Sequence, residues 1–122
     1  MTKKSQKDLI AKTYSDYKDA AQKLAYFVQC EPNEKAQIRA ARAAVIDSVL
    51  FLHRKGADMR FSILTPDGGR SFIIRALDSF DADFFFLSAT AADGRRFIFT
   101  PLDIQNVQIC SQKVVGSYVD GQ

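Results

Sequence analysis

The sequence contains no tryptophan, one histidine, two cysteines and three prolines. It also lacks a run of about 18 apolar residues, which a membrane-spanning helix would require. The basic residues that follow Met1 lead into no apolar stretch, so we expect no secretory signal, no membrane association and a cytoplasmic location. Cys30 and Cys110 form no CxxC motif and lie among apolar neighbours, which favours buried free thiols over a disulfide.

Residues suited to catalysis or metal binding are scarce as well. His53 is the only histidine, and the sequence has no nucleophile elbow, no P-loop and no zinc-ligand spacing. Asp78, Asp81 and Asp83 lie close together, but their spacing matches no calcium loop, and a polar turn between two strands explains them better. We therefore expect a protein that is not an enzyme and has no catalytic residues, no metal site and no cofactor.

The charge is unevenly distributed along the chain of 122 residues, whose net charge is +3. Residues 1–56 hold eleven Lys and Arg against six Asp and Glu, a balance of +5. Residues 57–122 hold six against eight, a balance of −2. The basic first half permits an anionic partner such as a nucleic acid.

Residues 1–56 have the pattern of a helical hairpin. Apolar residues recur at steps of three and four, which predicts helices over about residues 5–30 and 33–55. Pro32 suits the start of the second helix, and Gly56 suits its end. The short connection predicts antiparallel neighbours. The two apolar stripes consist of Ile10, Tyr14, Tyr17, Ala21, Leu24 and Val28, and of Ile38, Ala41, Val45, Val49 and Leu52.

After Gly56 the apolar residues alternate, which is typical of short strands joined by tight turns. Short strands within about sixty residues favour a small antiparallel β-barrel over residues 57–111, followed by a tail at 112–122. The third strand is expected to be apolar on both faces, and the fold class is α+β. The predicted strands are Met59–Thr65, Arg70–Leu77, Asp83–Thr90, Arg95–Thr100 and Val107–Cys110, with a short helical turn before the last one.

Several motifs follow one another in an order found in a known family. A helix ending in leucine and a basic run leads into the strand from Met59, then an Asp67-Gly68 turn, and later a Ser79-Phe80-Asp81 turn before an apolar strand. In these features, residues Leu50 to Ile109 resemble the Sm-like/Hfq-type family of small β-barrels. The resemblance implies a five-stranded Sm-like or SH3-like antiparallel barrel, an RNA-associated function and a tendency to form rings.

The residues that hold uridine in that family are not retained. Ala82-Asp83 stands where the family has a Gln-Phe pair, and no Tyr-Lys-His precedes the last strand. We therefore do not expect an Hfq-type uridine pocket. The strand spacing is also similar to the small Sm-like barrels of Rho-binding antiterminators, a resemblance that agrees on the fold and leaves the function open.

Basic residues are the candidate contacts to nucleic acid. Lys and Arg can follow phosphates through salt-sensitive contacts, and Arg beside an exposed aromatic such as Phe85 can stack on bases. The alternative is a solvated helix face together with ordinary ion pairs to Asp67, Asp78, Asp81 or Asp93. The candidates are Arg39, Arg42, His53, Arg54, Lys55, Arg70, Arg95 and Arg96.

Two functions remain open at this point. The first is a non-enzymatic RNA-associated Sm/Hfq-like module that binds single-stranded RNA, as a transcriptional or post-transcriptional regulator would. The second is a protein–protein interaction module or small inhibitor, which docks on a larger machine through the hairpin or a barrel edge. A homodimer through the hairpin is a further expectation. Helices of this length extend beyond so small a barrel, and a second copy can cover the apolar surface at their far end.

Overall fold

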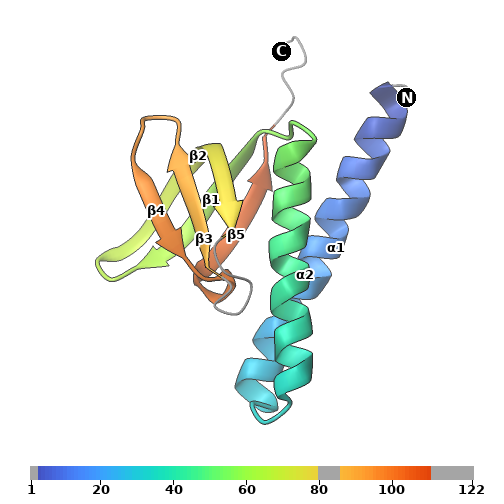
Figure 1. The fold of residues 1–122 in the computed structure, drawn as a ribbon, viewed down its shortest axis with the longest axis vertical. Coiled ribbons are helices and arrows are strands. Elements are labelled where there is room, and N and C mark those ends of the chain that lie inside the picture. Colours follow the sequence, from blue (N-terminus) through green and yellow to red (C-terminus); the bar gives the residue numbers. More distant parts are fainter. Residues whose placement is uncertain (1–2, 80–85, 111–122) are drawn as a thin grey trace.

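The helices and the antiparallel sheet that the sequence predicts are both present. The computed structural model describes residues 3–79 and 86–110 and shows two helices followed by a five-stranded sheet, an α+β arrangement (Figure 1). Asp81, Asp83, Phe85 and the predicted tail at 112–122 lie outside the described residues. The elements are α1 (Lys3–Cys30), α2 (Lys35–Arg54), β1 (Met59–Thr65), β2 (Gly68–Ser79), β3 (Leu87–Ala91), β4 (Arg96–Phe99), the 3-10 turn η1 (Pro101–Asp103) and β5 (Ile104–Ile109).

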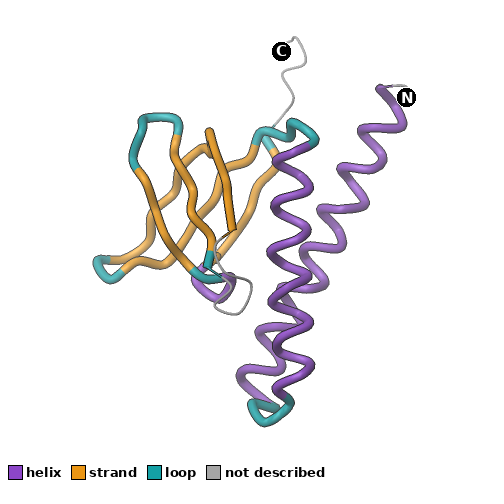
Figure 2. Tube along the Cα trace, in the orientation of Figure 1, coloured by secondary structure: helices purple, strands orange, loops and turns teal. Residues whose placement is uncertain are grey.

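The helices α1 and α2 pack as an antiparallel pair, because each presents one apolar stripe to the other (Figure 2). Leu24 on α1 and Val45, Val49 and Leu52 on α2 are all at most 2% exposed. Burial of each such side chain stabilises the fold by about 1.5–3 kcal/mol. Gly56 follows α2 with a φ of 83°, a conformation that suits glycine. The predicted bounds of both helices are confirmed to within two residues.

In the sheet, β1 lies between β2 and β5. The strand order is β4-β3-β2-β1-β5, and all neighbours are antiparallel. The long strand β2 changes its partner along its length: residues 68–73 pair with β1, and residues 74–79 pair with β3. A register shift between Ile74 and Ala76 marks the change. Such an irregularity bends a strand, so the two halves of the sheet turn toward each other.

This bend curls the sheet strongly. Phe61 on β1 and Phe99 on β4 have ring centroids 5.9 Å apart, although two strands separate them in the sheet. In a flat sheet the two strands would be about 14 Å apart, three times the usual spacing of about 4.8 Å. The predicted barrel closure is not shown, because β4 and β5 are the edges of an open sheet and no ladder joins them within the described residues.

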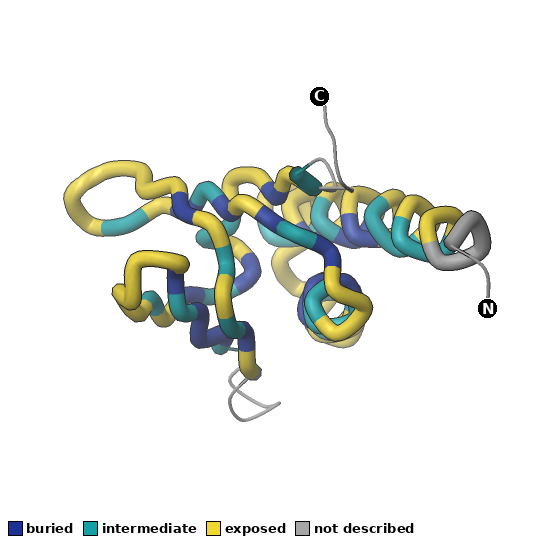
Figure 3. Tube along the Cα trace, turned by 90° about the horizontal axis from the view of Figure 1, so that it is seen from above, coloured by how far each residue is buried: buried dark blue, intermediate teal, exposed yellow. Residues whose placement is uncertain are grey.

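The hairpin and the sheet share one apolar core. Buried residues of both helices and of the strands form a single cluster. The Tyr14 hydroxyl on α1 donates a hydrogen bond to the Val107 carbonyl on β5, at 2.6 Å. Along β1, buried positions alternate with more exposed ones, so that one face of this strand contributes to the core. Figure 3 shows that buried and exposed stretches alternate along the chain. The start of α2 and the end of α1 project beyond the sheet (Figure 1).

Three details of the sequence analysis need correction. Phe86 is not part of a strand, and β3 begins at Leu87 rather than at Asp83, although its buried residues do lie on both faces. The last strand begins at Ile104, before Val107, because Ile104 already pairs with Ile63 of β1 directly after the 3-10 turn. Both cysteines are free as expected, but Cys30 is exposed rather than buried.

Candidate nucleic-acid interface

The eight candidate cations lie in three separate places. Arg39 and Arg42 belong to the first half of α2, and His53, Arg54 and Lys55 stand at its end. The other three stand beside two turns of the sheet: Arg70 on β2, Arg95 directly before β4 and Arg96 on β4. Positions 39 and 54 are about 22 Å apart along the helix axis at 1.5 Å per residue. The structure therefore does not bring these residues into one patch, and each group has to be considered by itself.

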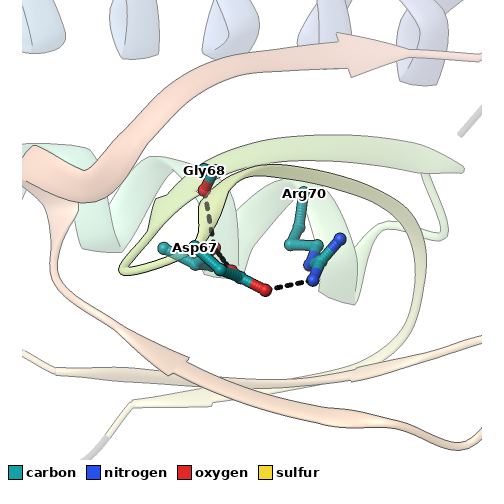
Figure 4. Close-up of polar contacts among 4 residues, drawn as sticks. Asp67, Gly68 and Arg70 are labelled. Carbon is teal, nitrogen blue, oxygen red and sulfur yellow. Dashed lines mark hydrogen bonds and ion pairs between the residues drawn. The ribbon is translucent and has the colours of Figure 1, made fainter.

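The turn between β1 and β2 already provides a partner for one candidate. Arg70 forms an ion pair with Asp67 (Figure 4). The Thr65 hydroxyl lies 2.6 Å from Oδ1 of Asp67 and 2.5 Å from the Gly68 carbonyl oxygen, and it can donate its proton to either. The Thr65 hydroxyl and the Arg70 charge lower the pKa of Asp67 below its ordinary value. The turn thus pairs Arg70 locally with an anion.

The turn between β3 and β4 has a similar arrangement. Oδ2 of Asp93 accepts a hydrogen bond of 2.8 Å from Nε of Arg95, and Oδ1 accepts one of 3.1 Å from the Arg95 backbone N–H. These contacts, the backbone hydrogen bond first, lower the pKa of Asp93. Arg96 donates to Oγ of the buried Ser88 at 3.1 Å. Ordinary pairing, the alternative raised from the sequence, is therefore confirmed for Arg70 and Arg95.

On α2 the arrangement differs, because two of the cations share a face with a buried residue. Residues 39, 42 and 46 lie on one side of the helix, at steps of three and four. Ile46 is 6% exposed and lies about 100° around the helix from Val45, whose stripe faces α1. Since α2 also packs against β2 and η1, this side of α2 faces the sheet.

Arg42 and Arg39 precede Ile46 and belong to the first half of α2, the helix whose start projects beyond the sheet (Figure 1). Arg39 is exposed and Arg42 is half-buried. Lys35, which is exposed, extends the same face by one more turn. We call Lys35, Arg39 and Arg42 the basic face of α2.

The end of α2 carries the third group of cations. Arg54 is exposed, His53 is half-buried, and Nζ of Lys55 lies 5.4 Å from the centroid of the Phe51 ring. Antiparallel packing places this end of α2 near the first turns of α1, where Lys7 is also exposed. This end of the hairpin is therefore a second basic region, separated from the basic face by most of the length of α2.

Among the exposed apolar side chains, two stand close together in the chain at the β4 edge of the sheet, and the sequence did not point to them. Ile98 on β4 is 59% exposed and Leu102 on η1 is 46% exposed. The alternation of Phe97, Ile98 and Phe99 was the signal that could have identified Ile98, because two neighbours that point inward leave the residue between them pointing outward. The edge strand β4 and the turn after it therefore present apolar surface.

Within residues 3–79 and 86–110, no group of three His, Cys, Asp or Glu side chains is arranged to hold a metal ion. No helix of the described chain is long and apolar enough to cross a membrane. Comparisons with protein-family models, with curated proteins and with solved structures found no match. The argument for function therefore rests on the residues themselves.

Proposed function

We propose that this chain is a non-enzymatic RNA-associated binding module of the Sm-like or SH3-like kind, whose helical hairpin contacts single-stranded RNA. The observation that carries this proposal is the basic face of α2, on which Lys35 and Arg39 are exposed and Arg42 is half-buried. Residues 1–56 have a charge balance of +5. In the described part of the sheet region, by contrast, five Arg stand against five Asp. Phosphate contacts of this kind are independent of base sequence and depend strongly on salt.

The curled sheet supports the barrel part of the proposal. Its two edge strands, β4 and β5, are connected only by Thr100 and the three residues of η1. The contact between the Phe61 and Phe99 rings brings β4 over the centre of the sheet. A curled five-stranded sheet with short connections is the architecture expected of a small barrel.

Fluorescence anisotropy with labelled U-rich and A-rich single-stranded RNA tests the RNA contacts. We expect micromolar or tighter binding at low salt that weakens steeply as salt is added, because bound cations displace counterions from the phosphates. The double variant R39E/R42E should weaken binding by at least about tenfold and reduce the slope of log K against log salt.

The matched control is the double variant R70E/R95E, which changes the net charge by the same amount in the two turns of the sheet. Since both arginines are paired with aspartates, this control should bind RNA nearly as well as the unchanged chain. Circular dichroism of each variant checks that the helices remain folded. Absence of binding at low salt, or an equal loss in both double variants, would contradict the proposal.

A protein partner at the sheet edge is the second candidate function, and the exposed side chain of Ile98 favours it. An edge strand can pair with a strand of a partner without any base-reading residue. A pull-down that compares the unchanged chain with Ile98→Asp tests this function. A partner retained by the first and lost by the second would support docking at β4, whereas equal retention would exclude this edge.

A further inference from the structure

A groove runs between α1 and α2 on the hairpin. Its volume is about 330 Å³, and all of its lining residues belong to the two helices. The α2 wall consists of the small side chains Ala40, Ala41 and Ala44 together with Gln37, and the α1 wall includes Phe27. A second hollow of about 430 Å³ continues from it at Phe27 toward Tyr26, near the far end of the hairpin.

The groove combines apolar and charged side chains and lies on the opposite side of α2 from its basic face. Ala40 and Ala44 are exposed, and Tyr26 is 50% exposed. Ala44 and Arg42 are two residues apart, which places them about 160° apart around the helix. An occupant of the groove therefore leaves the basic face clear.

We propose that a second copy of this chain occupies this groove, so that two hairpins pack face to face around a two-fold axis as four helices. A two-fold interface brings the same surface of each copy together, so its charges must complement themselves. The α1 wall carries charges of both signs, with Asp16 and Asp19 followed by Lys23. Asp16 forms an exposed ion pair of 3.2 Å with Lys12 of its own helix, and its second carboxylate oxygen can accept a further cation. Cations and anions on this wall can therefore pair with each other across a two-fold axis.

The spacing of these charges determines how the copies align. If the two α1 helices run antiparallel and the axis crosses them between positions 19 and 20, Asp16 of one copy lies opposite Lys23 of the other, and the pair occurs twice. Ala20 lies beside this axis and lines the groove, and its small side chain allows close approach of the helices. Asp19 precedes Lys23 of its own chain by four residues, a favourable spacing for an ion pair on a helix.

The size of the face is sufficient for a dimer. The 20 residues of α2 span about 30 Å, and two adjacent helices are about 20 Å wide. Each copy thus offers a face of about 600 Å², or about 1,200 Å² for the pair, which is at the lower end of specific interfaces. An interface of this size holds at micromolar concentrations only if its centre packs closely, and small residues permit this.

Sedimentation equilibrium of the full chain at concentrations up to about 100 µM tests the proposal. The unchanged chain should show twice the mass of one copy, which is 13.7 kDa. The variant Ala44→Arg inserts a long cation into the groove and should raise the dimer dissociation constant by at least about tenfold, while arginine remains a good helix former. Ala36→Arg is the matched control, because Ala36 is exposed on the same helix and does not line the groove.

A charge exchange tests the alignment itself. Asp16→Lys alone and Lys23→Asp alone place like charges opposite each other and should both weaken the dimer. The double variant D16K/K23D restores opposite charges across the axis and should recover most of the affinity. A chain that stays monomeric at about 100 µM, or a dimer indifferent to Ala44→Arg, would overturn the proposal. Weakening by both single variants without recovery in the double variant would overturn the antiparallel alignment.

Discussion

The helical hairpin and the sheet differ in how they carry charge. On the hairpin, cations lie on surfaces that project beyond the rest of the fold, and residues 1–56 have a balance of +5. In the sheet, Arg70 and Arg95 are held by aspartates two or three residues away. The hairpin also holds a local ion pair, between Lys12 and Asp16 one turn apart on α1. What distinguishes α2 is that Lys35, Arg39 and Arg42 share one face of the helix, whereas Arg70 and Arg95 stand beside two separate turns.

The two regions nevertheless share a core, and Phe61→Ala is the strongest test of their connection. Phe61 is 0% exposed and packs against Phe72 and Phe99. The substitution should lower the free energy of unfolding by about 3–5 kcal/mol, the usual cost of removing a buried aromatic ring. In urea, the loss of helical circular dichroism should coincide with the loss of protection of sheet amides in hydrogen exchange.

The control for Phe61→Ala is Ile98→Ala, at a position that is 59% exposed. It should change the free energy of unfolding by no more than about 0.5 kcal/mol. Helices that remain folded in urea after the sheet has unfolded would contradict a shared core and would mean that the hairpin is a separate folding unit.

Ionisable groups of the hairpin should change the stability of the fold at alkaline pH, and those of the sheet should change it at acid pH. The larger change comes from the hairpin. Burial, and to a lesser extent Tyr14, raises the pKa of Tyr17 from 10.0 to about 12. Because the folded state favours the neutral hydroxyl of Tyr17, the contribution of this group to stability is fully present below pH 10. It is lost as the pH rises toward about 12. At pH 11 the loss should be about 1.4 kcal/mol. Chemical unfolding of the unchanged chain and of Tyr17→Phe at pH 8 and 11 measures it, and the variant should lack this part of the alkaline loss.

The sheet should respond at acid pH, with the smallest effect of the three. The pKa values of Asp67 and Asp93 are lowered in the folded state. Their contribution to stability is therefore present above the ordinary carboxyl pKa of about 4 and is lost as the pH falls through the lowered values. Both carboxylates are exposed, so solvent screens them and the change should be slight. As the pH is lowered, the free energy of unfolding of Asp67→Asn should decline less than that of the unchanged chain. An equal decline in both chains would contradict this role of Asp67.

Sequence reasoning was most successful where local forces decide the structure. The helix bounds were predicted to within two residues because the apolar period, Pro32 and Gly56 all act locally. β1 was predicted with its observed bounds for the same reason, since alternation and the following turn define it. The pairing of Arg70 with Asp67 was also foreseen as an alternative, because the two residues are separated by a single turn.

Sequence reasoning was less successful where distant residues decide. The start of β5 at Ile104 depends on its pairing with β1, from Ile104 opposite Ile63 to Ile109 opposite Met59, which no local pattern contains. The groove could not be located from the sequence either, because its walls come from two helices that meet only after packing. For the candidate cations, their separation into three places became visible only in the fold.

The sequence by itself determined the α+β class, the hairpin, the charge asymmetry and the residues of both apolar stripes, because each depends on neighbours within a few turns of the chain. Only the tertiary structure decided the order β4-β3-β2-β1-β5, the partner change along β2 and the contact between Phe61 and Phe99. It also decided which cations are held by aspartates and which lie along α2. These features depend on contacts between residues far apart in the chain, and such contacts form when the two regions bury a common core.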